Sequence, residues 1–338
     1  MTPKERILKA LSHEETEIVP YQLSITAEAR EKLINYYGDN RFENWIVNHM
    51  AGTGPNLPKE YLKEKQYRDV WGCVWEEGNI LHLVETPLKE PSLSGYQFPN
   101  FSRPEYYQHI PEFIQAWKDR FTFFNLGLFF FERSWALRGF ENILMDLMLE
   151  PSFVEALLDR LVEIQLDIID RVKQYPFDAI GFGDDFGQQR GLIMGPSFWR
   201  RYFKPRLKIL YQRAHQLGFF VRIHSCGDNS EIMEDLIEIG VDIFNPFQPE
   251  AMDVYQLKKE FGHRIVFEGG ISTQRTLPFG SPDEVRFQAQ DCLKTLGAGG
   301  GYIAGPSKPI MPEVPAENAA TLIETLVFQR HYSGEKDG

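Results

Sequence analysis

Short apolar runs alternate with amphipathic segments along the second half of the chain. The runs are rich in Val, Ile, Phe and Gly, and each ends in polar, charged or glycine residues. Continuous apolar runs of this length are typical of strands that are buried on both faces. The runs lie at residues 178–183, 219–223, 241–245, 264–270 and 300–305.

The segments between these runs repeat apolar residues with the spacing of a helix. Ser281-Pro282-Asp283 supplies an N-cap with an acidic first turn, and Asn229-Ser230 is predicted to cap another helix. Strands that alternate with capped helices form βαβ units and therefore a parallel sheet. The predicted helices cover residues 197–217, 230–239, 251–261 and 282–296.

Polar and glycine-rich residues follow nearly every apolar run in this half. A barrel builds its catalytic face from the loops after its strands, and this pattern fits such a face. A doubly wound sheet also fits the alternation, but its GxGxxG turn after an early strand is missing from the sequence. We therefore predict an α/β fold of the (β/α)₈ TIM-barrel type.

The first half of the chain is less regular. The N-terminal residues form an amphipathic helical pattern, residues 18–25 and 122–131 are predicted strands, and residues 67–96 indicate a hairpin-like insertion. A barrel takes about 250 residues, so the N-terminal helices and the hairpin are additions to it. Since no long linker separates two cores, we predict a single domain over residues 1–338.

Charge and composition exclude several classes of protein. The formal net charge of −12 opposes binding to DNA, RNA or an anionic membrane. The longest apolar stretch, residues 121–131, is shorter than the roughly 20 residues that span a bilayer. Cys73, Cys226 and Cys292 form an odd, sparse set that suits a reducing compartment, and no apolar signal core opens the chain. We expect a cytoplasmic protein.

His224-Ser225-Cys226 is the most informative motif, because it follows directly on one of the predicted strands. His-x-Cys spacing can present an imidazole nitrogen and a thiolate to one Zn²⁺, with an open position for a substrate thiol. In the alternative, Cys226 packs as a small hydrophobe and His224 bonds a backbone carbonyl. A place at the C-terminal end of a barrel strand favours the metal site.

Acidic residues end two other runs. Asp184 and Asp185 are predicted catalytic groups, as a base, an acceptor for a substrate N–H or a hard-cation site. The alternative for this pair is an N-cap on the following helix. Glu268, before Gly269-Gly270, is predicted as a third metal ligand or a base, and its alternative is a salt bridge within the rim.

Further candidates surround these residues. Asn245 and Gln248 are neutral polar groups at another strand end and are suited to orienting a substrate. Lys308 is predicted to neutralise a substrate carboxylate or phosphate, unless it is an exposed lysine in a turn. Glu132-Arg133 is a candidate for carboxylate recognition. The remaining predicted substrate-binding residues are Phe182, Tyr302 and Ser307, although most aromatic residues in such a chain belong to the core.

These motifs resemble the uroporphyrinogen decarboxylase superfamily over nearly the whole chain. The resemblance is strongest over residues 178–324, through RIHSCGD, VDIFNPFQPE, FEGGIST and GGGYIAGPSKPIMPEVPAEN. It implies a (β/α)₈ barrel, a homodimer and one of two activities. The superfamily includes decarboxylases and cobalamin-dependent methyltransferases, which pass a methyl group from a corrinoid protein to a thiol such as coenzyme M.

Two departures from the superfamily's patterns affect the expected reaction. The arginine-rich RQAGR motif of uroporphyrinogen decarboxylases is absent after Pro20, where residues 21–28 hold no arginine. A substrate with eight carboxylates needs cationic partners, so tetrapyrrole decarboxylation is disfavoured. The methyltransferases hold zinc with His-x-Cys and a distant Cys, and alignment on Pro312 and Pro315 places Lys308 at that third position. Lysine is protonated near neutral pH, so Glu268 or another donor must complete the site.

The expected function is therefore zinc-dependent methyl transfer between a corrinoid or methylated substrate and a thiol. A corrinoid protein is the expected partner. The alternative is a decarboxylase of a smaller carboxylated substrate. In that case Asp184 or Asp185 would stabilise a developing cation, while Lys308 and an arginine would hold the carboxylate.

Overall fold

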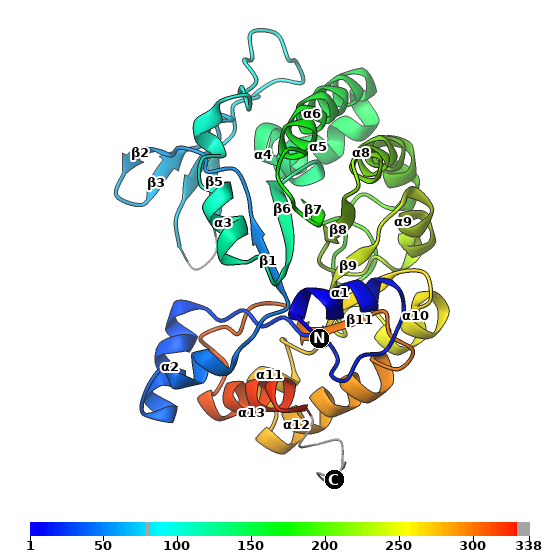
Figure 1. The fold of residues 1–338 in the computed structure, drawn as a ribbon. Coiled ribbons are helices and arrows are strands. Elements are labelled where there is room, and N and C mark those ends of the chain that lie inside the picture. The colour runs from blue at the N-terminus through cyan, green and yellow to red at the C-terminus, as the bar shows by residue number, and fades with distance from the viewer. Residues whose placement is uncertain (79–80, 330–338) are drawn as a thin grey trace, which may run out of the picture.

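A computed structural model describes residues 1–78 and 81–329 of the chain. Seven parallel strands form its main sheet, in the order β1-β6-β7-β8-β9-β10-β11, and the sheet curls around an axis (Figure 1). The strands are β1 (Met50–Thr53), β6 (Phe121–Leu128), β7 (Ala179–Gly183), β8 (Phe220–His224), β9 (Ile243–Phe247), β10 (Val266–Ile271) and β11 (Tyr302–Pro306).

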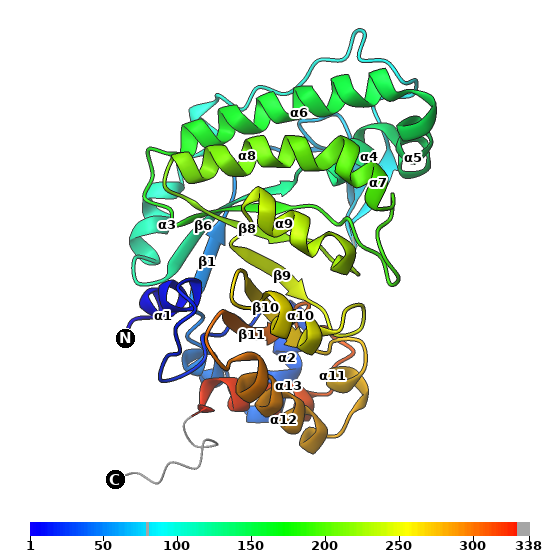
Figure 2. The same cartoon turned by 90° about the vertical axis from the view of Figure 1, so that its right-hand side faces the viewer.

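Helices connect successive strands, and the longest pair, α6 and α8, lie side by side across the outside of the sheet (Figure 2). None of the helices in the described ranges is long and apolar enough to cross a membrane. The helices before α7 are α1 (Pro3–Leu11), α2 (Ala27–Tyr37), α3 (Ile110–Ala116), α4 (Phe131–Arg138), α5 (Phe140–Leu149) and α6 (Pro151–Val172). Those that follow are α7 (Pro196–Phe198), α8 (Lys204–Gln216), α9 (Met233–Ile239), α10 (Val254–Phe261), α11 (Thr276–Phe279), α12 (Pro282–Asp291) and α13 (Ala316–Val327). Short 3₁₀ segments are η1 (Arg41–Trp45), η2 (Pro104–Tyr106) and η4 (Ser230–Ile232), and π-helical turns are η3 (Trp199–Phe203) and η5 (Cys292–Leu296).

Capping and burial explain why these segments fold as they do. Ser281 accepts a hydrogen bond from the backbone N–H of Glu284, and Glu284 bonds back to Ser281, so the predicted start of α12 is confirmed. Asn229 makes no side-chain cap bond, and that prediction is wrong. Every residue of β9 and β10 is buried, as their apolar sequences predict.

Helix α1 covers one end of the curled sheet. Ile7 and Ala10 of this helix pack with Met50, Phe121 and Ile303, which lie near the starts of their strands. Because the sheet is parallel, this closed end is the N-terminal end of the strands. The C-terminal strand ends therefore form the open end, where loops and side chains are free to build a site.

The sheet is an open half-barrel, and the predicted closed ring of eight strands is not found in the described residues. Residues 18–25, expected as a strand, make only isolated bridges, Tyr21 with Ala304 and Ile25 with Ile310. The backbone N–H of His49 donates to the carbonyl of Tyr21 at 3.3 Å. This segment thus lies between β11 and the start of β1 without forming a regular ladder with either.

The predicted hairpin-like insertion is a separate antiparallel sheet of four strands, in the order β2-β3-β4-β5. It begins a few residues earlier than expected, and residues 79 and 80 of the predicted range lie outside the described residues. The strands are β2 (Glu60–Lys63), β3 (Gln66–Arg68), β4 (Val74–Glu76) and β5 (His82–Glu85).

Candidate functional site

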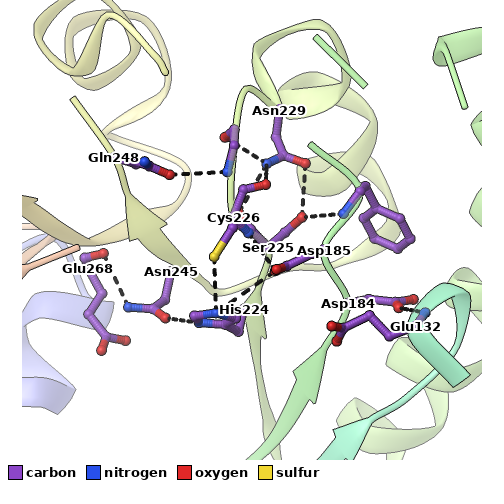
Figure 3. A network of polar contacts seen from close by, with 12 residues as sticks. Glu132, Asp184, Asp185, His224, Ser225, Cys226, Asn229, Asn245, Gln248 and Glu268 are labelled. Carbon is purple, nitrogen blue, oxygen red and sulfur yellow. Dashed lines mark hydrogen bonds and ion pairs between the residues drawn. The ribbon is translucent and has the colours of Figure 1, made fainter. Parts of the chain in front are cut away.

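His224, Cys226 and Asp185 meet at the open end of the sheet, beyond β7 and β8 (Figure 3). One donor atom from each lies within 4.8 Å of the other two. The Nε2 of His224 is 3.4 Å from the Sγ of Cys226 and 3.9 Å from Oδ1 of Asp185. The backbone N–H of Cys226 also donates to Asp185 Oδ1 at 2.8 Å. Neighbouring strand ends thus bring a nitrogen, a sulfur and a carboxylate oxygen together.

Asn245, in the middle of the next strand β9, sets the orientation of the His224 ring. The Nδ1 of His224 lies 2.6 Å from Oδ1 of Asn245 (Figure 3). An amide oxygen only accepts, so Nδ1 carries the proton and Nε2 presents its lone pair toward Cys226 and Asp185. An oriented neutral imidazole of this kind is the form that binds a metal.

A network of buried polar groups holds the loop after β8. The side-chain amide of Asn229 donates to the carbonyls of Ser225, Cys226 and Gly227, and Ser225 Oγ donates to Asn229 Oδ1 at 3.0 Å. Gln248 Oε1 accepts from the backbone N–H of Gly227 at 3.2 Å. Gln248 was expected to orient a substrate, but it is buried and orients this loop instead. Ser225 and Asn229 hold the loop after β8 in place, and their spacing in the sequence does not predict this role.

Gly227 shows how tightly this loop is packed against the one after β7. Its φ is +81°, and a Cβ placed on it would lie 2.3 Å from the carbonyl carbon of Gly187. Only glycine fits such a contact. The two loops that carry the donor groups are therefore fixed relative to each other.

Burial keeps the Cys226 thiol protonated at neutral pH. Burial raises its pKa to about 12, and the nearby Asp185 carboxylate adds to the rise. A thiol must lose its proton to bind a metal, so binding here releases a proton. Imidazole, thiolate and carboxylate together match the ligand chemistry of Zn²⁺, and three protein ligands leave one position open.

Glu268 does not join this donor group, contrary to its expected role as a metal ligand. Both of its oxygens accept hydrogen bonds from Arg222, at 2.7 Å from Nε and 2.8 Å from Nη2, and the pair is largely buried. The salt bridge within the rim is therefore the correct alternative. Asp185, and not Glu268, lies with His224 and Cys226 in the group of donor atoms that could hold a metal ion.

Asp184 is a helix cap rather than a catalytic group. Its two oxygens accept from the backbone N–H groups of Phe131 and Glu132, each at 2.7 Å, where α4 begins. Burial, and next the charge of Glu132, raise the pKa of Asp184, while the two N–H groups oppose that rise. The expected cap was on the following helix, whereas the helix actually capped follows the neighbouring strand β6.

Glu132 is the acidic group beside this cap. Burial, aided by the charge of Asp185, raises the pKa of Glu132 to about 8. Glu132 therefore carries a proton at neutral pH and can act as a proton donor at the edge of the site. In the sequence, the position of Glu132 directly after the Phe-rich strand indicates that it belongs to the site.

A cavity of about 210 Å³ lies beside His224, and we call it the metal-side cavity. Ser307 is buried and donates to the carbonyl of Ile271 at 2.9 Å, so its hydroxyl is already engaged. Lys308 is exposed, and its charge acts to lower the pKa of Cys226. Residues lining the cavity include Gln22, Arg222, His224, Asn245, Ser307 and Lys308.

Two aromatic residues expected in the pocket belong to the core instead. Phe182 packs edge-on against Phe129 and Tyr211, with ring centroids 5.0 and 4.8 Å away. Tyr302 is 1% exposed, and its hydroxyl donates to the carbonyl of Gly269 at 2.7 Å. Neither side chain lines the metal-side cavity.

Comparisons with known proteins identify the family. The family model of uroporphyrinogen decarboxylase (URO-D) matches residues 135–327. Uroporphyrinogen decarboxylase of Coxiella burnetii (strain Dugway 5J108-111) is 23% identical over 185 residues, which cover 52% of this chain and 48% of that protein. Methylcobamide:CoM methyltransferase MtaA of Methanosarcina barkeri is 24% identical over 169 residues, or 50% and 47% of the two chains. The chain thus spans about half the length of the curated relatives it matches.

A solved structure extends the likeness of fold to nearly the whole chain. The methyltransferase from Methanosarcina mazei superposes with a TM-score of 0.71 at 18% identity, covering 98% of this chain and 100% of that one. Decarboxylases and methyltransferases thus occur together among the relatives. Because the family model spans more than half of the sequence, the protein belongs to the uroporphyrinogen decarboxylase family.

Proposed function

We propose that this enzyme transfers a methyl group between a corrinoid or methylated compound and a thiol, with Zn²⁺ held by Asp185, His224 and Cys226. The observation that carries the proposal is the grouping of three donor atoms within 4.8 Å at the open end of the sheet. The methyltransferases among the relatives support this choice of reaction. A bound zinc would lower the pKa of a substrate thiol in its open position.

The chain's own residues prepare the site for this chemistry. Asn245 fixes the His224 ring with Nε2 free, and the loop network holds Cys226 against Asp185. Lys308 places a positive charge on the wall of the metal-side cavity, where it would attract an anionic substrate. Glu132, protonated at neutral pH, supplies a proton at the opposite edge.

Metal analysis tests the ligand set directly. The full chain, purified without chelators, is expected to hold about one zinc, and Cys226→Ser, His224→Gln and Asp185→Asn are expected to lose it. Glu268→Gln is the discriminating variant, because it should keep zinc if Arg222 alone engages that carboxylate. Circular dichroism confirms folding of each variant. Zinc absent from the wild-type chain would overturn the proposal.

A decarboxylase is the second candidate, and the match to uroporphyrinogen decarboxylases favours it. In that reaction Lys308 would hold a substrate carboxylate, and Asp185 would stabilise a developing cation. Asp184 is removed from this role because it caps α4. Demethylation of methylcobalamin in the presence of 2-mercaptoethanesulfonate supports methyl transfer, whereas CO₂ release from a small carboxylated substrate, with methylcobalamin unchanged, supports the decarboxylase.

We propose a cytoplasmic homodimer in which residues 1–338 form one domain and a corrinoid protein is the partner of the methyl transfer. Residues 330–338 of that domain lie outside the described residues. Light scattering of the purified chain measures the dimer, and co-purification with a corrinoid protein measures the partnership.

A further inference from the structure

A groove of about 510 Å³ lies on the outside of the fold, between α10, α11 and α12 (Figure 2). We call it the α12 groove, because most of its wall comes from that helix. It shares no residue with the metal-side cavity. Its wall consists of Tyr255 from α10, Thr276 from α11, and Asp283, Glu284, Phe287, Gln288 and Asp291 from α12.

One face of α12 lines this groove with an exposed ring and two carboxylates. Glu284, Phe287, Gln288 and Asp291 are spaced by three and four residues, so their side chains lie on the same side of the helix. Phe287 is 73% exposed and Tyr255 is 42% exposed. The Tyr255 hydroxyl donates to Asp291 and so holds a second ring beside this face. Two aromatic rings are thus presented to solvent next to acidic groups.

The charge of the groove is negative. Among the described residues, the charged groups of its wall are Asp283, Glu284 and Asp291, and all three are acidic. Asp283 is compensated by Arg286, which lies 2.7 Å away. Within the described ranges, Glu284 and Asp291 accept hydrogen bonds from hydroxyl and backbone N–H groups, which carry no charge. Two uncompensated carboxylates therefore flank the Phe287 ring, and a cation complements them.

A guanidinium group suits this combination of rings and carboxylates better than an ammonium group does. Its planar face stacks on an aromatic ring, while its N–H groups donate to carboxylate oxygens in the same plane. It is also more weakly hydrated than an ammonium group, so less free energy is lost when it lies against a ring. The groove is thus complementary to the side chain of an arginine.

The exposed apolar surface continues beyond the groove. Phe279 lies three residues after Thr276 in α11, on the same side of that helical turn, and is 82% exposed. A small cation in the groove would leave the Phe279 ring in water. An arginine that is flanked by apolar residues on another protein would cover it, and exposed aromatic residues are enriched in such interfaces.

We propose that the α12 groove is a docking site for another protein, which inserts an arginine side chain flanked by apolar residues. The guanidinium stacks on Phe287 and donates to Glu284 and Asp291, while the flanking residues cover Phe279. This site does not depend on the proposed function, because none of its residues belongs to the donor group around His224.

Isothermal titration calorimetry of the full chain with the peptide acetyl-Leu-Arg-Leu-amide tests the proposal. Saturable binding is expected, and Phe287→Ala should weaken it about two- to fivefold because the ring is lost. Glu284→Gln keeps an acceptor for the helix cap but removes a charge, and should weaken binding by a similar factor. Adding Asp291→Asn to Glu284→Gln should weaken binding about tenfold. Phe140→Ala on α5 and Glu163→Gln on α6 replace exposed residues elsewhere and are the matched controls.

Two further ligands separate a protein partner from a free cation. Acetyl-Leu-Gln-Leu-amide lacks the charge and should bind about tenfold more weakly than the arginine peptide. Methylguanidinium lacks the leucines and should also bind about tenfold more weakly, because it leaves the apolar surface uncovered. Methylguanidinium binding as tight as that of the arginine peptide would assign the groove to a free organic cation and overturn the docking of a protein.

Three other results would overturn the proposal. These are no saturable binding of the arginine peptide, equal binding of the arginine and glutamine peptides, or binding that Phe287→Ala and the double variant both leave unchanged. Circular dichroism of each variant confirms that it is folded, so a loss of binding reports on the groove itself.

Discussion

The donor group of Asp185, His224 and Cys226 depends on contacts between single side chains from different elements. His224 and Cys226 come from one loop, but their usefulness depends on Asn245 and Asp185 from the strands on either side. The bond from His224 Nδ1 to Asn245 fixes both the tautomer and the ring plane. Such outer partners commonly contribute 10- to 100-fold, as an order of magnitude, to the affinity of a metal site.

Asn245→Ala is therefore expected to weaken zinc binding by about 10- to 100-fold while the chain stays folded. The variant removes the acceptor for Nδ1–H, so the ring turns freely and loses its fixed Nε2. Competition with a chromophoric zinc chelator measures the affinity. Asn35→Ala, on the exposed face of α2, is the control. An unchanged affinity in Asn245→Ala would show that the ring is oriented by other contacts.

The sequence predicts a residue of this site correctly only where residues close to it in the chain determine its position. His224 and Cys226 follow one strand, and their spacing is enough to bring them together. Glu268 could not be assigned correctly, because its partner Arg222 lies on another strand inside an apolar run. Which carboxylate faces the thiol depends on the pairing of strands across the sheet. Spacing along the chain does not reveal that pairing.

At the scale of elements, Asp184 links two parts of the fold that are distant in sequence. It extends from the end of β7 to the first turn of α4, which follows the neighbouring strand β6. Helix α4 carries Glu132, so the cap also places this carboxyl group where the charge of Asp185 acts on it. A change in this cap should affect stability and site together.

Asp184→Asn is expected to lower the free energy of unfolding by about 1–3 kcal/mol, since an amide replaces one of two acceptors with a donor. Urea unfolding followed by circular dichroism measures the loss. The matched control is Asp253→Asn at the start of α10, where one acceptor oxygen is enough and asparagine caps equally well. Equal stability of Asp184→Asn and wild type would contradict the importance of the cap.

A helix or strand can be predicted from the sequence where its own residues, and not its pairing with a distant segment, determine its conformation. The five apolar runs of the second half are strands in the structure, because each is long enough to be buried between helices. Strand β1 has the sequence Met-Ala-Gly-Thr, which carries little strand signal, and only its pairing with β6 defines it. Residues 18–25 show the opposite case, in which a strand-like sequence makes only isolated bridges.

At the scale of the whole molecule, Gln329, the last residue that the structure describes, contacts the chain at Val19. Gln329 Oε1 accepts from the backbone N–H of Val19, and its amide donates to the carbonyl of the same residue. Tyr21 lies opposite Ala304 of β11 in an isolated bridge, and its carbonyl accepts from the backbone N–H of His49 on the other side. The segment that spans the opening of the half-barrel thus depends on contacts from residues both near and far in sequence, which supports the proposed single domain.

His49 makes the stability of this junction depend on pH. Burial, with the charge of Arg6, lowers its pKa from 6.5 to about 4. The neutral ring is therefore required in the folded chain, while the unfolded chain takes up a proton below pH 6.5. The contribution of His49 to the unfolding free energy should therefore fall by about 1.4 kcal/mol per pH unit as pH decreases from 6.5 toward 4. Urea unfolding across this range measures the slope of the unfolding free energy against pH.

His49→Gln should lower this slope, because the variant takes up one proton fewer on unfolding. His263→Gln replaces an exposed residue and should leave the slope unchanged. Identical slopes in His49→Gln and wild type would assign the acid sensitivity to other groups.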